Sequence, residues 1–151
     1  MWRHRHLVPF HATTPDKRNM DRTVDFDSIL FHPFLSDEAQ VNPRIYGAEL
    51  AFWLSRKLAG RGIETSYPRS EDWGWYLEYS RQDGKAYLLR CANFDGNDSQ
   101  WRCIVEPRGQ GMLGLKKAPL DDAAPLLQAL RSILSSEGDI HNVTWSDEGS
   151  R

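Results

Sequence analysis

The chain has little of several features that mark common functional classes. Its formal net charge is only −2 over 151 residues. Without an excess of lysine and arginine there is no global attraction to nucleic acid or to an anionic membrane, so nucleic-acid binding is not expected. The chain also lacks a run of about 18 apolar residues, so neither a transmembrane helix nor a membrane partner is expected.

Catalytic and metal-binding motifs are equally scarce. The sequence contains no G-x-S-x-G, no H-E-x-x-H and no phosphate-binding P-loop. The two cysteines, Cys91 and Cys103, do not have the C-x-x-C spacing of a zinc site. We expect them to be buried thiols facing each other across two strands, with a cross-strand disulfide as the alternative. The sequence therefore predicts no catalytic residue, no metal and no cofactor.

One stretch matches a cofactor motif in its letters, because Gly109, Gly111 and Gly114 follow the dinucleotide pattern G-x-G-x-x-G. The pattern binds a pyrophosphate only where the glycines turn a strand directly into a helix. Here Pro119 would interrupt such a helix within about two turns. We therefore interpret residues 108–118 as a loop or lid, or as a contact with a partner, with weak anion binding as a further alternative.

The first 20 residues differ from the rest in charge and pattern. Four basic residues against one aspartate give them a local charge of +3, and three of the five histidines lie there. The stretch lacks the apolar core of a secretory signal, which favours a cytoplasmic protein with reduced thiols. We expect a flexible basic tail over residues 1–22, with Met20 as a candidate natural start. The alternatives are an arm that contacts phosphates and a histidine-rich metal tail.

Apolar periodicity predicts two helices in a single domain over residues 23–147, before a polar tail at 148–151. The first helix is expected from a cap at Asn42 to Gly60 or Gly62, and the second over residues 120–138. Alternation and turn residues predict six strands. Their expected ranges are 26–31, 62–67, 73–79, 85–94, 101–106 and 140–145.

The central strands also suggest a register. Asp-Gly turns at 83–84 and 95–96 place Tyr79 opposite Tyr87, Trp75 opposite Cys91 and Cys91 opposite Cys103. The predicted fold is α+β, a two-layer sandwich of one mostly antiparallel sheet (order β-α-β-β-β-β-α-β) with both helices on its aromatic face. That face should include Trp73 and Trp75, with Arg90 and Glu78 on the other. The expected core residues are Trp75, Leu77, Leu89, Cys91, Cys103, Leu54 and Leu130.

Two function classes compete on this sequence. Six tryptophans and an apolar glycine-rich loop favour a non-enzymatic protein-binding domain, an immunity-type or regulatory module, with a protein partner or a homodimer. The alternative is a small-ligand binder or enzyme with a site at Glu71, Asp72 and Trp73, covered by the 108–118 loop. The candidate binding residues are Trp53, Glu71, Asp72, Trp73, Met112, Leu113 and Leu115.

Overall fold

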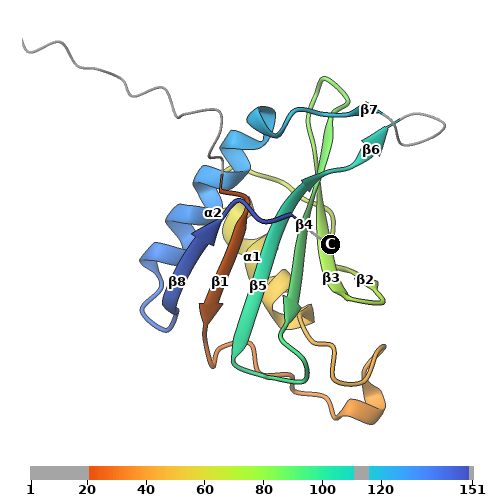
Figure 1. Cartoon of the computed structure of the whole chain (residues 1–151), viewed down its shortest axis with the longest axis vertical. Coiled ribbons are helices and arrows are strands. Elements are labelled where there is room, and N and C mark those ends of the chain that lie inside the picture. The colour runs from red at the N-terminus through yellow and green to blue at the C-terminus, as the bar shows by residue number, and fades with distance from the viewer. Residues whose placement is uncertain (1–20, 111–115, 150–151) are drawn as a thin grey trace, which may run out of the picture.

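The computed structural model of the chain describes residues 21–110 and 116–149. The predictions made for the basic tail and for Met112, Leu113 and Leu115 fall outside these residues. Six strands form one sheet in which every pair is antiparallel (Figure 1). In sheet order they are β2 (Arg69–Glu71), β3 (Gly74–Ser80), β4 (Ala86–Asn93), β5 (Gln100–Pro107), β1 (Thr23–Asp27) and β8 (His141–Ser146).

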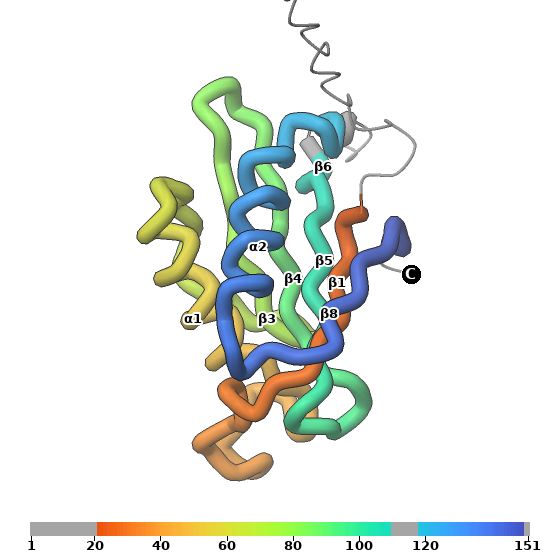
Figure 2. Tube along the Cα trace, turned by 90° about the vertical axis from the view of Figure 1, so that its left-hand side faces the viewer, coloured from red at the N-terminus to blue at the C-terminus, as the bar shows by residue number. Residues whose placement is uncertain are grey.

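Two helices, α1 (Ala48–Ala59) and α2 (Ala124–Ser136), lie on the same side of this sheet (Figure 2). The order of elements along the chain confirms the predicted α+β class. A second, two-stranded sheet pairs β6 (Gly109–Gln110) with β7 (Lys116–Lys117). Gly109, the first glycine of the dinucleotide pattern, therefore belongs to a strand of this hairpin, while Gly111 and Gly114 lie outside the described residues.

The register of the central hairpins agrees with the prediction. Trp75 pairs with Cys91, and Tyr79 pairs with Tyr87. Cys91 in turn pairs with Cys103 on β5. This register directs the apolar side chains of β3, β4 and β5 toward the helices, so the alternation of side chains along each strand builds one side of the core.

The helices supply the other side of that core. In α1, the stripe of Leu50, Ala51, Leu54 and Leu58 is wholly buried. In α2, the predicted stripe is also buried, and each leucine contributes on the order of 1.5–3 kcal/mol relative to an exposed position. Of the expected core residues, only Trp75 is partly exposed. Trp101 is fully buried and donates its indole N–H to the carbonyl oxygen of Ser28 at 3.0 Å.

Three predicted boundaries are wrong, because hydrogen bonds to other segments of the chain override the apolar pattern. The strand predicted over 26–31 ends at Asp27, since the Ser28 hydroxyl donates to the Asp139 carbonyl oxygen and accepts from the Leu30 N–H. The first helix begins at Ala48 and not at Asn42, because the Tyr46 N–H donates to the Asn93 side chain.

The third boundary concerns the strand predicted over 62–67. That segment is not a strand, and β2 forms only after Pro68. Ser66 alone pairs with Glu78, through its backbone N–H and its hydroxyl. The second helical segment also starts with a 3₁₀ turn (Leu120–Ala123) before α2 begins.

Candidate functional site

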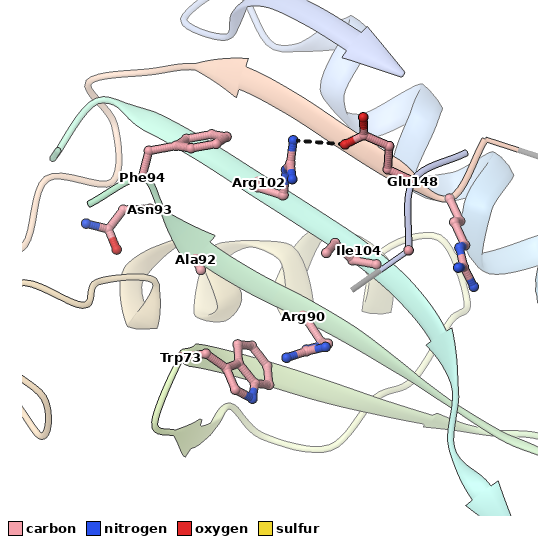
Figure 3. A pocket seen from close by; sticks show the side chains of 10 residues that line it. Trp73, Arg90, Ala92, Asn93, Phe94, Arg102, Ile104 and Glu148 are labelled. Carbon is pink, nitrogen blue, oxygen red and sulfur yellow. Dashed lines mark ion pairs between the residues drawn. The ribbon is translucent and has the colours of Figure 1, made fainter. Parts of the chain in front are cut away.

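The face of the sheet away from the helices carries a hollow of about 860 Å³. Its floor comes from β4 and β5, where Arg90 lies opposite Ile104 and Ala92 lies opposite Arg102. Figure 3 shows these side chains and the C-terminal segment that borders them. The lining residues are Arg22, Trp73, Arg90, Ala92, Asn93, Phe94, Arg102, Ile104, Glu148 and Gly149.

Two arginines in the hollow each rest on an aromatic ring. The guanidinium carbon of Arg90 lies 3.7 Å from the centre of the Trp73 ring, and that of Arg102 lies 5.2 Å from the centre of the Phe94 ring. A guanidinium group stacked in this way keeps its N–H edge available for hydrogen bonds in the plane of the group. The two rings therefore help to fix the direction in which the arginines point.

Carboxylates bind the N–H edges of the same two arginines. Arg102 donates two hydrogen bonds to Asp25, at 2.7 and 2.8 Å, and Arg90 donates one to Glu106 at 3.0 Å. The hydrogen bonding of Arg102 to Asp25 raises the pKa of the Arg102 guanidinium, so this group stays charged. An arginine that donates two hydrogen bonds to one carboxylate is held in a specific geometry, so Arg102 is the most rigid charged group in the hollow.

The remaining charges are held more loosely. The Glu148 carboxylate lies 3.6 Å from Arg102 and its side chain is 66% exposed. The Arg22 guanidinium lies against Gly149, where a side chain would collide with it. Among the described residues, Arg22 makes no ion pair with a carboxylate.

The position of Trp73 corrects the sequence prediction. It was expected beside Trp75 on the core face, yet its ring lies under Arg90 on the opposite face. The reason is Gly74, whose φ of 152° breaks the alternation between the two tryptophans. Arg90 and Glu78 were expected on the same face of the sheet. Arg90 pairs with Glu106, while Glu78 lies 2.6 Å from Arg108.

A second candidate surface is the end of the domain where four connections meet, shown at the bottom of Figure 1. Hydrogen bonds join these connections: Ser28 N–H to Ser99, the Ser28 hydroxyl to Asp139, and the Asn42 amide to the Glu71 carbonyl. We call this surface the acidic end. It comprises residues 27–46, 71–73, 94–99 and 137–140.

The name reflects its charge. These four segments contain nine carboxylates and a single arginine, Arg44. The carboxylates include Glu71 and Asp72, which the sequence singled out and which are both exposed. Asp98 is paired with His32 at 2.7 Å, and Asp37 accepts a hydrogen bond from the Tyr46 hydroxyl at 2.6 Å. Most of this negative charge therefore faces solvent.

Large apolar side chains are exposed at the same end. Ile29 and Phe34 are 79% and 80% exposed, and Leu30, Leu35 and Val41 also lie open to solvent. All five belong to the connection between β1 and α1. Apolar side chains that gather on one exposed connection, with polar residues around them, are typical of a contact surface for another protein.

Trp53 has a structural role that the sequence did not reveal. Its ring is partly buried, 5.1 Å from the Phe31 ring, and Lys57 lies over it. It therefore contributes to the core beneath the connection after β1. Its neighbour Phe52 is half exposed and lies 6.3 Å from the Tyr67 ring.

The described ends of the 108–118 segment lie far from the predicted ligand site. Arg108 donates its backbone N–H to Ala86, and β6 and β7 lie at the opposite end of the sheet from β2 (Figure 1). These strands are not placed to cover Glu71 and Asp72. Glu71 and Asp72 also do not form one site with Trp73, because of these three residues only Trp73 lines the hollow.

The described residues contain no helix long and apolar enough to cross a membrane, and no group of three or more His, Cys, Asp or Glu side chains that could hold a metal ion. Comparisons with protein-family models, curated proteins and solved structures found no match for the chain.

Only part of each surface could be predicted from the amino-acid pattern. Arg90 and Arg102 alternate with core residues and were expected on the open face, but the contribution of Arg22 and Phe94 depends on contacts between distant segments. The apolar run at 28–31 has the pattern of a buried strand. The exposure of Ile29 and Leu30 within this run depends on the Ser28 hydrogen bonds, which involve residues more than 70 positions away.

Proposed function

We propose that this protein is a non-enzymatic binding domain whose acidic end engages a basic protein partner. The observation that supports the proposal is the set of five exposed apolar side chains among nine carboxylates. The apolar residues would supply the area that is removed from water, at about 25 cal/mol per Å². The carboxylates would select a positively charged partner and accelerate its association.

The arrangement also supports a protein partner over a small substrate. Ile29, Phe34 and Val41 are largely exposed to solvent on a connection, and they do not line the hollow on the sheet. Interfaces of standard size bury about 800 Å² on each partner, which a surface of four connections can supply. A regulatory or immunity-type role, in which binding itself is the activity, is compatible with this surface.

A photo-crosslinker at Phe34 tests the proposal directly. Full-length protein with p-benzoylphenylalanine at position 34 would be irradiated in lysate of its source cell, and adducts would be identified by mass spectrometry. We expect one dominant adduct with a strongly basic protein. The matched control carries the crosslinker at Tyr67, which is equally exposed, at 80%, but outside the acidic end.

Charge dependence completes the test. Exchanging Asp37 and Glu38 for lysine should abolish the adduct at position 34, and added salt should weaken it. An adduct with an acidic protein, or equal adducts at positions 34 and 67, would refute the proposal. An adduct between two copies of this chain would also refute it, and would assign the surface to a homodimer.

A further inference from the structure

The hollow on the open face of the sheet shares Trp73 and Phe94 with the acidic end, but its chemistry points to a different ligand. We propose that it binds a small organic molecule with one anionic oxygen group, a carboxylate or a phosphate ester, on an apolar or aromatic body. The proposal rests on the charges, the rigidity and the apolar floor of the hollow. It does not depend on the proposed protein-binding function.

The balance of charges around the hollow indicates the charge of the ligand. Three arginines line the hollow, and three carboxylates balance their charge: Glu106 pairs with Arg90, while Asp25 and Glu148 both lie beside Arg102. Asp25 and Glu106 bind through short hydrogen bonds, whereas Glu148 is mostly exposed and lies 3.6 Å from Arg102. Glu148 is therefore the carboxylate that a ligand can displace. Its displacement leaves one uncompensated positive charge, which suits a monoanion.

The positive groups are already oriented before a ligand arrives. Asp25 and Phe94 hold Arg102, and Glu106 and Trp73 hold Arg90. A site with fixed donors loses less conformational entropy on binding than one with free side chains. Arg22, at the border of the hollow beside Gly149, is the arginine without a carboxylate partner among the described residues, so it can turn toward the anion.

The body of the ligand would lie on the apolar part of the hollow. Ala92 and Ile104 form its floor between the two arginines, and the Phe94 ring borders it. The volume of about 860 Å³ falls in the range of about 300–1,000 Å³ that is usual for small-molecule sites. An aromatic acid would place its ring against these side chains and its anionic group between Arg22 and Arg102.

Glu148 also affects how tightly a ligand would bind in the hollow. Its backbone carbonyl accepts a hydrogen bond from the Thr23 hydroxyl, which holds the segment beside β1. Its carboxylate occupies the place that the anionic group of a ligand would take, as Figure 3 shows for its contact with Arg102. Glu148 is therefore an internal competitor, and removing its charge should increase affinity.

Nuclear magnetic resonance of the full-length protein tests this inference. Benzoate, methyl phenyl phosphate and benzamide would be added separately, and the indole N–H signal of Trp73, assigned with Trp73→Phe, would be followed. We expect benzoate or methyl phenyl phosphate to bind at least about tenfold more tightly than neutral benzamide, because charge-assisted hydrogen bonds are lost with the amide. The tighter of the two anions identifies the anionic group.

Three variants show where binding occurs. Arg22→Gln should weaken binding of the anion by about tenfold, because one charged donor is lost. Glu148→Gln should strengthen it by about threefold at low salt, as expected for a loosely held exposed carboxylate. Arg61→Gln, an exposed arginine beyond the end of α1, is the matched control and should leave affinity unchanged.

Several outcomes would overturn the inference. These are equal binding of benzoate and benzamide, no binding of either anion, or weaker binding by Glu148→Gln. An equal loss of affinity in Arg22→Gln and Arg61→Gln would also overturn it, because it would indicate attraction to the overall charge and not to the hollow.

Discussion

The sulfur atoms of Cys91 and Cys103 lie 3.8 Å apart on neighbouring strands, and neither side chain is exposed to solvent. The contact with Cys91, together with burial, raises the pKa of the Cys103 thiol well above its usual value. A buried thiol that stays protonated is a poor nucleophile, because the thiolate is the reactive form. The pair therefore belongs to the core of the sheet.

This leads to the first prediction, on thiol reactivity. Native protein at pH 8 should react with a thiol reagent such as dithionitrobenzoate about a hundredfold more slowly than protein unfolded in guanidinium, since the thiols must first be exposed. Both cysteines should react after unfolding, without added reductant. Rapid reaction in the native state would contradict the burial, and no reaction after unfolding would reveal a disulfide.

The second prediction concerns acid stability. Lys85 lies 2.6 Å from Asp122, and this hydrogen bond lowers the pKa of the Asp122 carboxyl. A lowered pKa means that the stabilisation is present above the usual aspartate range and is lost as the pH falls through the folded-state value. Asp122→Asn should destabilise the protein only slightly near neutrality, because both side chains are about one-third exposed and solvent screens the pair.

The measurement is the urea midpoint from pH 7 to pH 2. Its decrease on the acid side should be smaller in Asp122→Asn than in the unmodified protein. Asp121→Asn, whose side chain is exposed, is the control and should keep the original slope. Identical acid slopes in the unmodified protein and Asp122→Asn would show that this pair has no part in the pH dependence.

The third prediction follows from the backbone at Gly74. Its φ is 152°, and a Cβ atom there would lie 2.6 Å from the Cys91 carbonyl oxygen and 2.9 Å from the Ala92 Cβ. Gly74→Ala should therefore reduce the free energy of unfolding by about 2–4 kcal/mol, through strain and overpacking. Gly138→Ala, where a Cβ meets no atom within 4 Å, should change it little. Chemical denaturation measures both.

The fourth prediction concerns Trp101. Its ring packs 6.0 Å from Phe31, and its N–H donates to Ser28, the residue that ends β1. Trp101→Phe should destabilise the protein by about 2–4 kcal/mol, because it opens a cavity and leaves a buried carbonyl without its donor. Trp145→Phe, on the edge strand β8, should cost less than half as much. Equal effects of the two changes would contradict this account of the core.

The elements that could be predicted are those whose structure depends on residues close together in the sequence. The hairpins of β3, β4 and β5 follow from two Asp-Gly turns and from strict alternation, because a shift of one residue would turn the apolar side chains outward. The stripe of α2 is predicted for a similar reason, since its period is set by the helix itself.

The parts that could not be predicted depend on contacts between distant segments. The apolar stretch after Asp27 has the composition of a strand, and only its bonds to Ser99 and Asp139 show that it leaves the sheet. Trp73 was placed on the wrong face because the φ of Gly74 is not visible in the alternation pattern. The hollow was missed because Arg22 and Glu148 come from opposite ends of the chain.

The position of β1 in the sheet has a consequence for biosynthesis. β1 lies between β5 and β8, and its Thr23 pairs with both Ile104 and Ser146. The first strand of the described residues must therefore wait for β5, and the sheet is complete only after β8 has been made. Such distant pairings slow folding, because a long loop must close before its contacts form. During synthesis, one edge of β1 stays unpaired until β8 is available, and Ser146, the partner of Thr23, comes more than 100 residues later in the chain.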